Sequence, residues 1–340
     1  MSNPKVTSFE VAKRAGVSQS AVSRVFTPGA SASKTMTDKV RRAADELGYR
    51  PNVLARAMAS GKSRMIGLVV AYLDNHFYPE ALQKFSNKLQ ERGYHVLMFM
   101  ASQTAGNIEN IVEEILDFQV DGIIFASVAL SSEIVEKCRD AGVPAILFNR
   151  SQDLDGVSAV TSDNFEGGRK VARVLADHGH RRIAYIAGWE GASTQRDREH
   201  GFRAGLAEME CALFARGVGN FDTQQASDVA LEMFDKPASQ RPDAVFVAND
   251  HMAFAVIDVL RGRLDLDIPG DVAVVGYDDV PQAAWAGYGL STVRQRANLM
   301  VERTVETLLH QIENPNDFEH QRVAIDGPLV LRNTTKNISI

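Results

Sequence analysis

The feature that most constrains the fold is an alternation of short apolar runs with longer amphipathic segments between residues 64 and 293. Apolar, β-branched runs are typical of buried strands, and apolar residues at i, i+3, i+4 and i+7 are typical of helices that cover them. The alternation therefore predicts parallel, doubly wound α/β sheets. Strands are expected at 64–71, 94–100, 122–126, 144–148, 157–161, 182–187, 244–247, 272–275 and 290–293, and helices at 77–92, 106–118, 131–141, 164–178, 196–214, 223–234 and 250–262.

The alternation occurs twice, which predicts a body of two lobes. Open α/β sheets bind ligands beyond the carboxyl ends of their strands. The cleft between the lobes is therefore the expected ligand site. The expected lobes are 64–161 with 295–323 and 162–294 with 324–340.

The charge of the chain is strongly uneven. Residues 1–64 contain twelve lysines and arginines against four acids, a net of +8, whereas the remaining residues carry 25 basic and 39 acidic side chains, a net of −14. A basic end on an acidic body is typical of a nucleic-acid-binding arm.

The basic segment has the spacing of a helix-turn-helix. Thr7 and Glu10 form a capping box that starts a short helix, Gly16 ends it, and Ser18 is placed to cap a second helix. The second helix of this motif enters the major groove of DNA. Gln19 and Arg24 have the amide and guanidinium forks that bond adenine and guanine edges, with Ser20 as an adaptable neighbour. The alternative is that residues 18–20 only cap an exposed helix.

A third helix at 35–47 is expected to close the small core of a head domain, residues 1–50. Residues 51–63 form a hinge or linker, with a predicted helix at 53–59. A helix of two turns is marginal in water, so it is expected to order only when docked on DNA and on a second copy.

Motifs along this head resemble the LacI/GalR family of bacterial transcription regulators. The resemblance implies a DNA-binding regulator, with repression the commoner mode, and a body like the periplasmic binding proteins. It extends to about residue 332. The motifs that carry it are Val6-Thr7, Val11-Ala12, Ala15-Gly-Val-Ser18, Val22-Ser-Arg-Val25, Leu47-Gly-Tyr-x-Pro-Asn52 and Ala55-Arg56.

In this family paired hinge helices lie in the minor groove, where a leucine from each partner wedges between base pairs. The matching residue here is Met58, whose flexible apolar side chain also suits a wedge. The alternative is that Met58 only packs the hinge pair. The DNA-binding residues expected from motif and resemblance together are Thr7, Ser18, Gln19, Ser20, Ser23, Arg24, Asn52, Ala55 and Met58.

Polar residues follow several predicted strands, and the resemblance implies that some of them bind an effector. Amide, carboxylate and guanidinium groups beside aromatic rings suit a sugar, although a purine or an organic acid would suit some of them. Several sugar-responsive relatives have aspartate at position 149; Asn149 followed by Arg150 leaves room for a sugar acid or sugar phosphate. For Asp250 and Asp279, helix capping is the favoured interpretation. The expected effector-binding residues are Asp74, Phe77, Asn149, Arg198, Phe221, Asn249 and Asp278.

Catalysis is not expected, and neither a cofactor nor a metal is predicted. His178 and His180 are spaced i, i+2 with no third ligand nearby, which is poor zinc geometry, and Gly179 between them fits a helix C-cap. Gly167 and Gly168 lack the lysine of a phosphate loop. No serine nucleophile with a histidine and aspartate is found.

Composition fits a cytoplasmic protein. Cys138 and Cys211 are the only cysteines, which fits a reducing compartment. Neither a signal peptide nor a membrane-spanning run is found. An exported sugar-binding protein would share the body but would need a leader and no basic head. Two heads on a two-fold axis would read a pseudo-palindromic operator, and a homodimer is expected because the chain shows no apolar heptad tail.

Overall fold

The computed structural model describes residues 6–27, 30–50, 62–101, 108–152 and 155–336. The expected hinge helix at 53–59, with Asn52, Ala55 and Met58, lies outside these residues. The chain divides into two compact units, Met1–Arg64 and Met65–Ile340, which we describe separately.

The described residues of the first unit contain the helices α1 (Ser8–Ala15), α2 (Gln19–Phe26) and α3 (Lys34–Leu47). The capping box is confirmed, because the Thr7 amide donates to Glu10 Oε2 at 2.8 Å and the Glu10 amide donates to Thr7 Oγ1 at 3.4 Å. The predicted third helix is confirmed as well, and it begins one residue earlier than expected. The three helices pack on a core of Val11, Ala12, Val22, Val40, Ala43 and Ala44.

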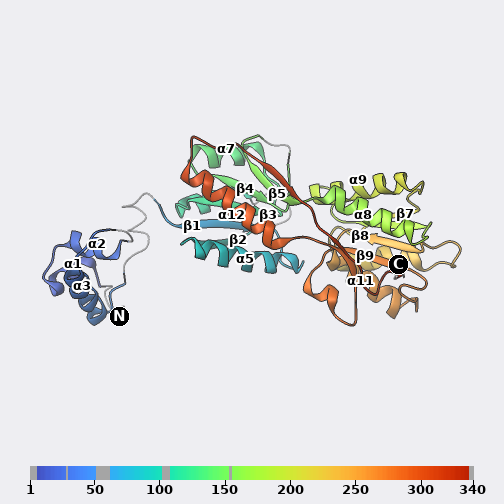
Figure 1. Cartoon of the computed structure of the whole chain (residues 1–340), viewed down its shortest axis with the longest axis horizontal. Coiled ribbons are helices and arrows are strands. Elements are labelled where there is room, and N and C mark those ends of the chain that lie inside the picture. Colours follow the sequence, from blue (N-terminus) through green and yellow to red (C-terminus); the bar gives the residue numbers. More distant parts are fainter. Residues whose placement is uncertain (1–5, 28–29, 51–61, 102–107, 153–154, 337–340) are drawn as a thin grey trace. The chain divides into compact units, whose positions relative to one another are not determined.

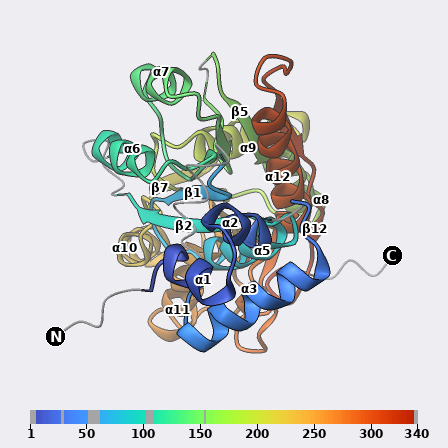
Figure 2. The ribbon, with the colours of Figure 1, turned by 90° about the vertical axis from the view of Figure 1, so that its left-hand side faces the viewer.

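The second unit contains two six-stranded sheets (Figure 1). The first has the order β11-β5-β4-β3-β1-β2, and all of its strands are parallel. Helices α6 and α7 cover one face, and α5 and α12 cover the other (Figure 2). The elements are β1 (Met65–Val70), α5 (Phe77–Glu91), β2 (His95–Met100), α6 (Ile108–Asp117), β3 (Gly122–Ala126), α7 (Ser132–Asp140), β4 (Ala145–Phe148), β5 (Ser158–Ser162), α12 (Ala297–Glu313) and β11 (Arg322–Ile325).

The second sheet has the order β12-β10-β9-β8-β6-β7, and only β12 runs antiparallel. β11 belongs to the first sheet and β12 to the second, so the chain passes between the lobes three times. The elements are α8 (Asn164–Asp177), β6 (Ile183–Ala187), α9 (Ser193–Glu208), β7 (Ala215–Val218), α10 (Thr223–Phe234), β8 (Ala244–Val247), α11 (Asp250–Gly262), β9 (Ala273–Asp278), the 3-10 turn η2 (Pro281–Ala284), β10 (Ser291–Arg294) and β12 (Leu329–Val330).

The predicted helix at 196–214 is wrong at both ends. α9 spans Ser193–Glu208, and Ala215–Val218 forms an edge strand that pairs with β6. The apolar residues 211–214 continue the helical pattern in the sequence, so the pattern alone gave no stop. The strand expected at 272–275 extends to Asp278, which places that side chain at the carboxyl end of the sheet. Among the described residues no helix is both long and apolar enough to cross a membrane.

Glycines let α8 and α9 cross in close contact. A Cβ atom on Gly168 would lie 2.1 Å from the backbone oxygen of Arg198, and one on Gly201 would lie 1.8 Å from the backbone oxygen of Phe165. Backbone atoms cannot yield as a flexible side chain can. The glycine pair at 167–168 therefore has a packing role, and Gly179, with φ of 85°, follows the end of α8.

Replacing Gly201 by alanine is expected to lower the free energy of unfolding by about 1–3 kcal/mol, because the new methyl group overpacks the crossing. The matched control is Gly262→Ala in α11, where nothing lies within 4 Å of the added atom and helix propensity favours alanine by about 1 kcal/mol. Urea denaturation measures both. Equal stability of the two variants would show that the crossing tolerates a Cβ.

Candidate functional site

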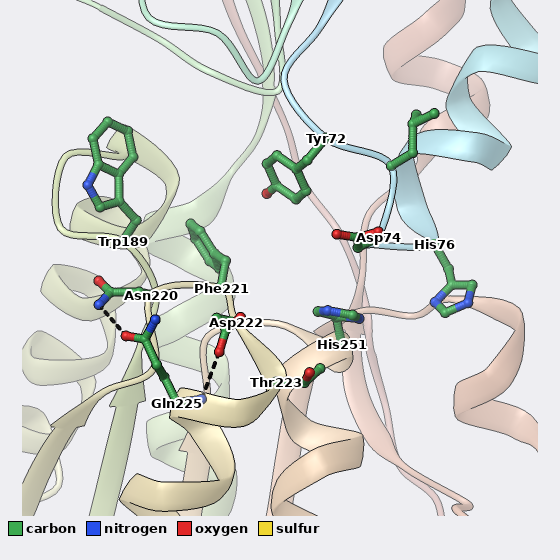
Figure 3. Close-up of a pocket in the computed structure, with 11 residues that line it drawn as sticks. Tyr72, Asp74, His76, Trp189, Asn220, Phe221, Asp222, Thr223, Gln225 and His251 are labelled. Atoms are coloured by element: carbon green, nitrogen blue, oxygen red, sulfur yellow. Dashed lines mark hydrogen bonds between the residues drawn. The ribbon is translucent and has the colours of Figure 1, made fainter. Parts of the chain in front are cut away.

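A cavity of about 680 Å³ lies where the loops after strands of both sheets meet (Figure 3). One side comes from the segment after β1, and the other from segments after β6, β7 and β8 in the second lobe. This is the position at which open α/β sheets bind ligands. The lining includes Tyr72, Asp74 and His76 from the first lobe and Trp189, Asn220, Phe221, Asp222, Thr223, Gln225 and His251 from the second.

Two of the seven predicted effector residues, Asp74 and Phe221, line this cavity. Phe77 instead belongs to the core of the first lobe, where its ring is parallel to that of Phe148 at a centroid distance of 6.1 Å. The other four, Asn149, Arg198, Asn249 and Asp278, are buried. All of these four except Arg198 end or follow a strand.

The buried charges of Arg198 and Asp278 compensate each other. The guanidinium lies 3.6 Å from Asp278 Oδ1, donates from Nε to Asn164 Oδ1 at 2.8 Å, and lies 3.7 Å from the ring centroid of Tyr277. Burial raises the pKa of Asp278, while the positive charge of Arg198 opposes that rise. Burial also raises the pKa of Tyr277 to about 12. This cluster is a neutralised pair packed against an aromatic ring.

Asp278 also joins the two lobes. Asn75, from the segment after β1, donates from Nδ2 to Asp278 Oδ2 at 2.9 Å, and Gln295 donates from Nε2 to Oδ1 at 2.6 Å. A second contact between lobes runs from the Ser151 amide to Ser193 Oγ at 3.1 Å. Both contacts lie beside loops that carry predicted effector residues, so a change in the lobe angle must strain or break them.

Asn149 and Asn249 each keep one buried polar atom without a partner. Asn149 Nδ2 donates to the Tyr78 hydroxyl at 3.1 Å, but its Oδ1 has no partner. Asn249 Oδ1 caps α11 by accepting from the Met252 amide at 3.0 Å, but its Nδ2 has none. Buried polar atoms are nearly always satisfied, so each of these atoms has capacity for one more hydrogen bond, although neither asparagine belongs to the cavity lining.

The expected capping roles of Asp250 and Asp279 are wrong. Asn249 is the N-cap of α11, and the Asp250 carboxylate accepts from the Val280 amide at 3.0 Å and the Thr292 hydroxyl at 2.6 Å. Burial, and next the charge of Asp278, raise the pKa of Asp250.

Asp279 forms ion pairs with Arg294 and Arg332, each at 2.6 Å. It thereby links the end of β9 to the end of β10 and to a later segment. Both acids therefore fasten distant segments, and tertiary contacts override the local capping preference.

Several cavity residues were not predicted. Tyr72, Trp189 and His251 follow strands that the sequence did predict, so position after a strand was a usable signal. Asn220 and Asp222 follow β7, which was itself not predicted. His76 and His251 both line the cavity, with their ring centroids 6.4 Å apart, and burial lowers the pKa of His251. No group of three or more metal-ligating side chains occurs in the described residues.

In the head, the predicted reading residues share the exposed surface of α2 and its cap. Ser18 caps the helix by accepting from the Ala21 amide at 3.2 Å, and its hydroxyl lies 2.9 Å from that of Ser20. Gln19 Nε2 donates to Ser8 Oγ at 2.9 Å. Thr7, Ser23 and Arg24 are exposed as well. The capping alternative therefore holds for Ser18 and leaves the outward side chains free for another role.

Comparison with known proteins defines the class first. Residues 9–52 match the family model of bacterial regulatory proteins of the lacI family, and residues 172–335 match a periplasmic binding protein-like domain. The ribose operon repressor of Escherichia coli (strain K12) is 31% identical over 332 residues, covering 96% of this chain and 98% of that protein. The repressor PurR of Vibrio vulnificus is 29% identical over 337 residues, covering 97% and 98%.

Solved structures agree. The lac repressor dimer bound to operator and the anti-inducer ONPF has a TM-score of 0.85 at 26% identity, covering 97% of this chain and 99% of that one. The complex of the transcriptional regulator CelR with cellobiose has a TM-score of 0.73 at 29% identity, covering 97% and 100%. The chain belongs to the LacI family of bacterial regulatory proteins, whose relatives named above are transcriptional regulators and not enzymes. The predicted helix-turn-helix head and two-lobed α/β body are confirmed.

Proposed function

We propose that this chain is a homodimeric transcriptional repressor whose affinity for a pseudo-palindromic operator is set by a small molecule bound between the lobes. The observation that carries the proposal is the presence in one chain of a basic helix-turn-helix head, whose second helix exposes polar side chains, and a cavity lined from both lobes. Operator DNA is cytoplasmic, so the proposal includes that location.

On the DNA side, Gln19, Ser20 and Arg24 are proposed to read base edges in the major groove. Thr7, Ser18 and Ser23 have hydroxyl groups suited to phosphate oxygens, the contacts that position such heads. The proposed hinge, residues 51–63, contributes Asn52, Ala55 and Met58 in the minor groove.

On the effector side, the proposed ligand is a sugar or sugar acid. Asp74 and Phe221 would contact it in the cavity, and Asn149, Arg198, Asn249 and Asp278 would bind or position it from the strand ends. The unpartnered atoms of Asn149 and Asn249 support this role. One relative is named the ribose operon repressor, and one solved neighbour is a complex with cellobiose. A carbohydrate is therefore the favoured class of effector.

The proposed mechanism is a change in lobe angle. A ligand that contacts both lobes alters the contacts Asn75 to Asp278 and Ser151 to Ser193, and it rotates lobe 64–161 with 295–323 against lobe 162–294 with 324–340. In a dimer this moves the two chains where residues 62–64 enter the body. The short hinge helices then form or melt, and operator affinity changes with them.

Selection of bound duplexes from random DNA by the full-length protein tests the proposal. We expect a pseudo-palindrome with half-sites centred about one helical turn apart, and a change in its affinity when a sugar or sugar acid is added. The alternative, a sugar-binding protein with no DNA role, predicts a ligand that binds while no sequence is enriched. That result would overturn the proposal.

A further inference from the structure

Among the residues that the structure describes, Arg150 is a buried cation with no acidic partner. It follows β4, only 5% of its surface is exposed, and its Nε has no hydrogen-bond partner. Within the described ranges no carboxylate forms an ion pair with Arg150. Arg198, the other buried arginine in those ranges, is paired with Asp278. Burying a charge is costly unless an opposite charge compensates it.

Arg150 does not itself line the cavity, but it lies directly behind a residue that does. Its guanidinium carbon lies 5.2 Å from the ring centroid of Trp189, and Trp189 lines the cavity together with Tyr72. The positive charge of Arg150 also acts on the Tyr72 hydroxyl, where it opposes the rise in pKa caused by burial. A cation over an aromatic ring is held in place by the ring but not neutralised by it.

The surroundings of Arg150 add positive potential. The next residue, Ser151, bonds Ser193 at the start of α9. The first turn of α9 contains no acidic residue, and its N-cap, Ala192, makes no side-chain cap. A helix N-terminus favours anions. Glu190, the acid next to Trp189, is held by Arg216 at 2.7 Å.

The part of the cavity away from Trp189 contains carboxylate and imidazole side chains instead of a positive charge. Asp74, His76 and His251 lie away from Trp189 in Figure 3. Asp222, also in the lining, accepts from the Gln225 amide at 2.8 Å as the cap of α10. The carboxylates and imidazoles there are acceptors and donors suited to hydroxyl groups.

We propose that the effector carries an anionic group, a carboxylate or a phosphate, which Arg150 binds beside Trp189, while its hydroxyl groups face Asp74, Asp222 and the two histidines. The anionic group supplies the negative charge that the guanidinium of Arg150 lacks as a partner among the described residues. This inference deepens the proposed function and rests on it for the location of the effector.

Fluorescence of Trp189 tests the inference in the full-length protein, because the chain has only two tryptophans and Trp285→Phe leaves one reporter. The probes are glucose, glucuronate and glucose 6-phosphate, the corresponding galactose and ribose series, and inorganic phosphate, all at constant ionic strength. The carboxylate and phosphate arms distinguish the two sources of the anion. We expect at least one anionic sugar to bind about tenfold or more tightly than its neutral parent.

Three variants isolate the contribution of Arg150. Arg150→Met should weaken binding of the anionic sugar about tenfold or more and leave neutral sugars unchanged, and Arg150→Lys should retain part of the preference. Arg263→Met removes one exposed charge at the end of α11 and should change nothing. Melting temperatures show whether each variant is folded.

The inference is overturned if a neutral sugar binds as tightly as its acid and phosphate, if Arg150→Met keeps the affinity for the anion, or if no anion in the set gives a saturable response. The proposed function is tested separately by operator binding. A neutral sugar that binds as tightly as its anionic forms and changes operator affinity would support the proposed function and contradict the inference of an anionic effector. An anionic sugar that binds through Arg150 without changing operator affinity would support the inference about the ligand and contradict the proposed function.

Discussion

Replacing Gln19 and Arg24 by alanine abolishes the preference for operator over random DNA. Each bidentate contact to a base edge discriminates by about 1–3 kcal/mol, so the double variant should lose roughly 2–6 kcal/mol of specificity. Both side chains are exposed on α2, and the core of the head does not include them, so the head should stay folded. The measurement is the ratio of operator to random-duplex dissociation constants by gel shift.

The matched control is Arg41→Ala, which removes one positive charge from an exposed position on α3. This substitution should lower the affinity for operator and random duplex by the same factor, because a contact to phosphate carries no sequence information. Ligand binding by the body should be unchanged in all of these variants. If the double variant kept its operator preference, α2 would not be the reading helix.

Replacing Asp278 by alanine abolishes the effector response and destabilises the body. The change leaves Arg198 buried without its acid and removes the acceptor of Asn75 and Gln295. Removing one member of a buried pair costs about 3–5 kcal/mol. Urea denaturation measures the loss, and gel shifts with and without the ligand measure the response.

Two further variants separate the response from stability. Asp278→Asn retains an acceptor oxygen and should be more stable than the alanine variant, yet it should also lose the response because the charge is gone. Glu113→Ala, which breaks an exposed pair with Lys137, should change stability little. A normal effector response in a folded Asp278→Asn variant would mean that the cleft residues are wrongly assigned.

The elements that sequence predicted well are those with local signals. The capping box at Thr7, the end of the first helix at Gly16 and the predicted apolar strands of both sheets follow from spacing and periodicity. α12, β11 and β12 were not predicted as elements. β11 pairs with β5 and β12 pairs with β10, strands that lie far away in sequence, and α12 packs on the first sheet.

The candidate site was predicted only in part, because its residues are brought together by tertiary contacts between segments far apart in sequence. Asp74 and Phe221 lie in the cavity as expected, whereas Phe77 lies in the core. Position after a strand indicated Trp189 and His251 as candidates, but only the tertiary structure shows that they share one cavity with Tyr72 of the other lobe. Asp250 shows the same limit, because its partner Thr292 lies 42 residues away.

The central claim is that a ligand in the cleft and a DNA duplex on the head shift the same equilibrium, the one between the two lobe angles with the hinge helices formed or melted. The measurement that tests it most directly is a thermodynamic cycle. It combines operator affinity with and without the tightest-binding sugar acid or sugar phosphate, and the affinity for that ligand with and without operator. Linkage requires that the two ratios be equal, and coupling of about 1–3 kcal/mol predicts a factor of roughly 5–150 in each. A factor of one in both arms, with both partners bound, would contradict the account.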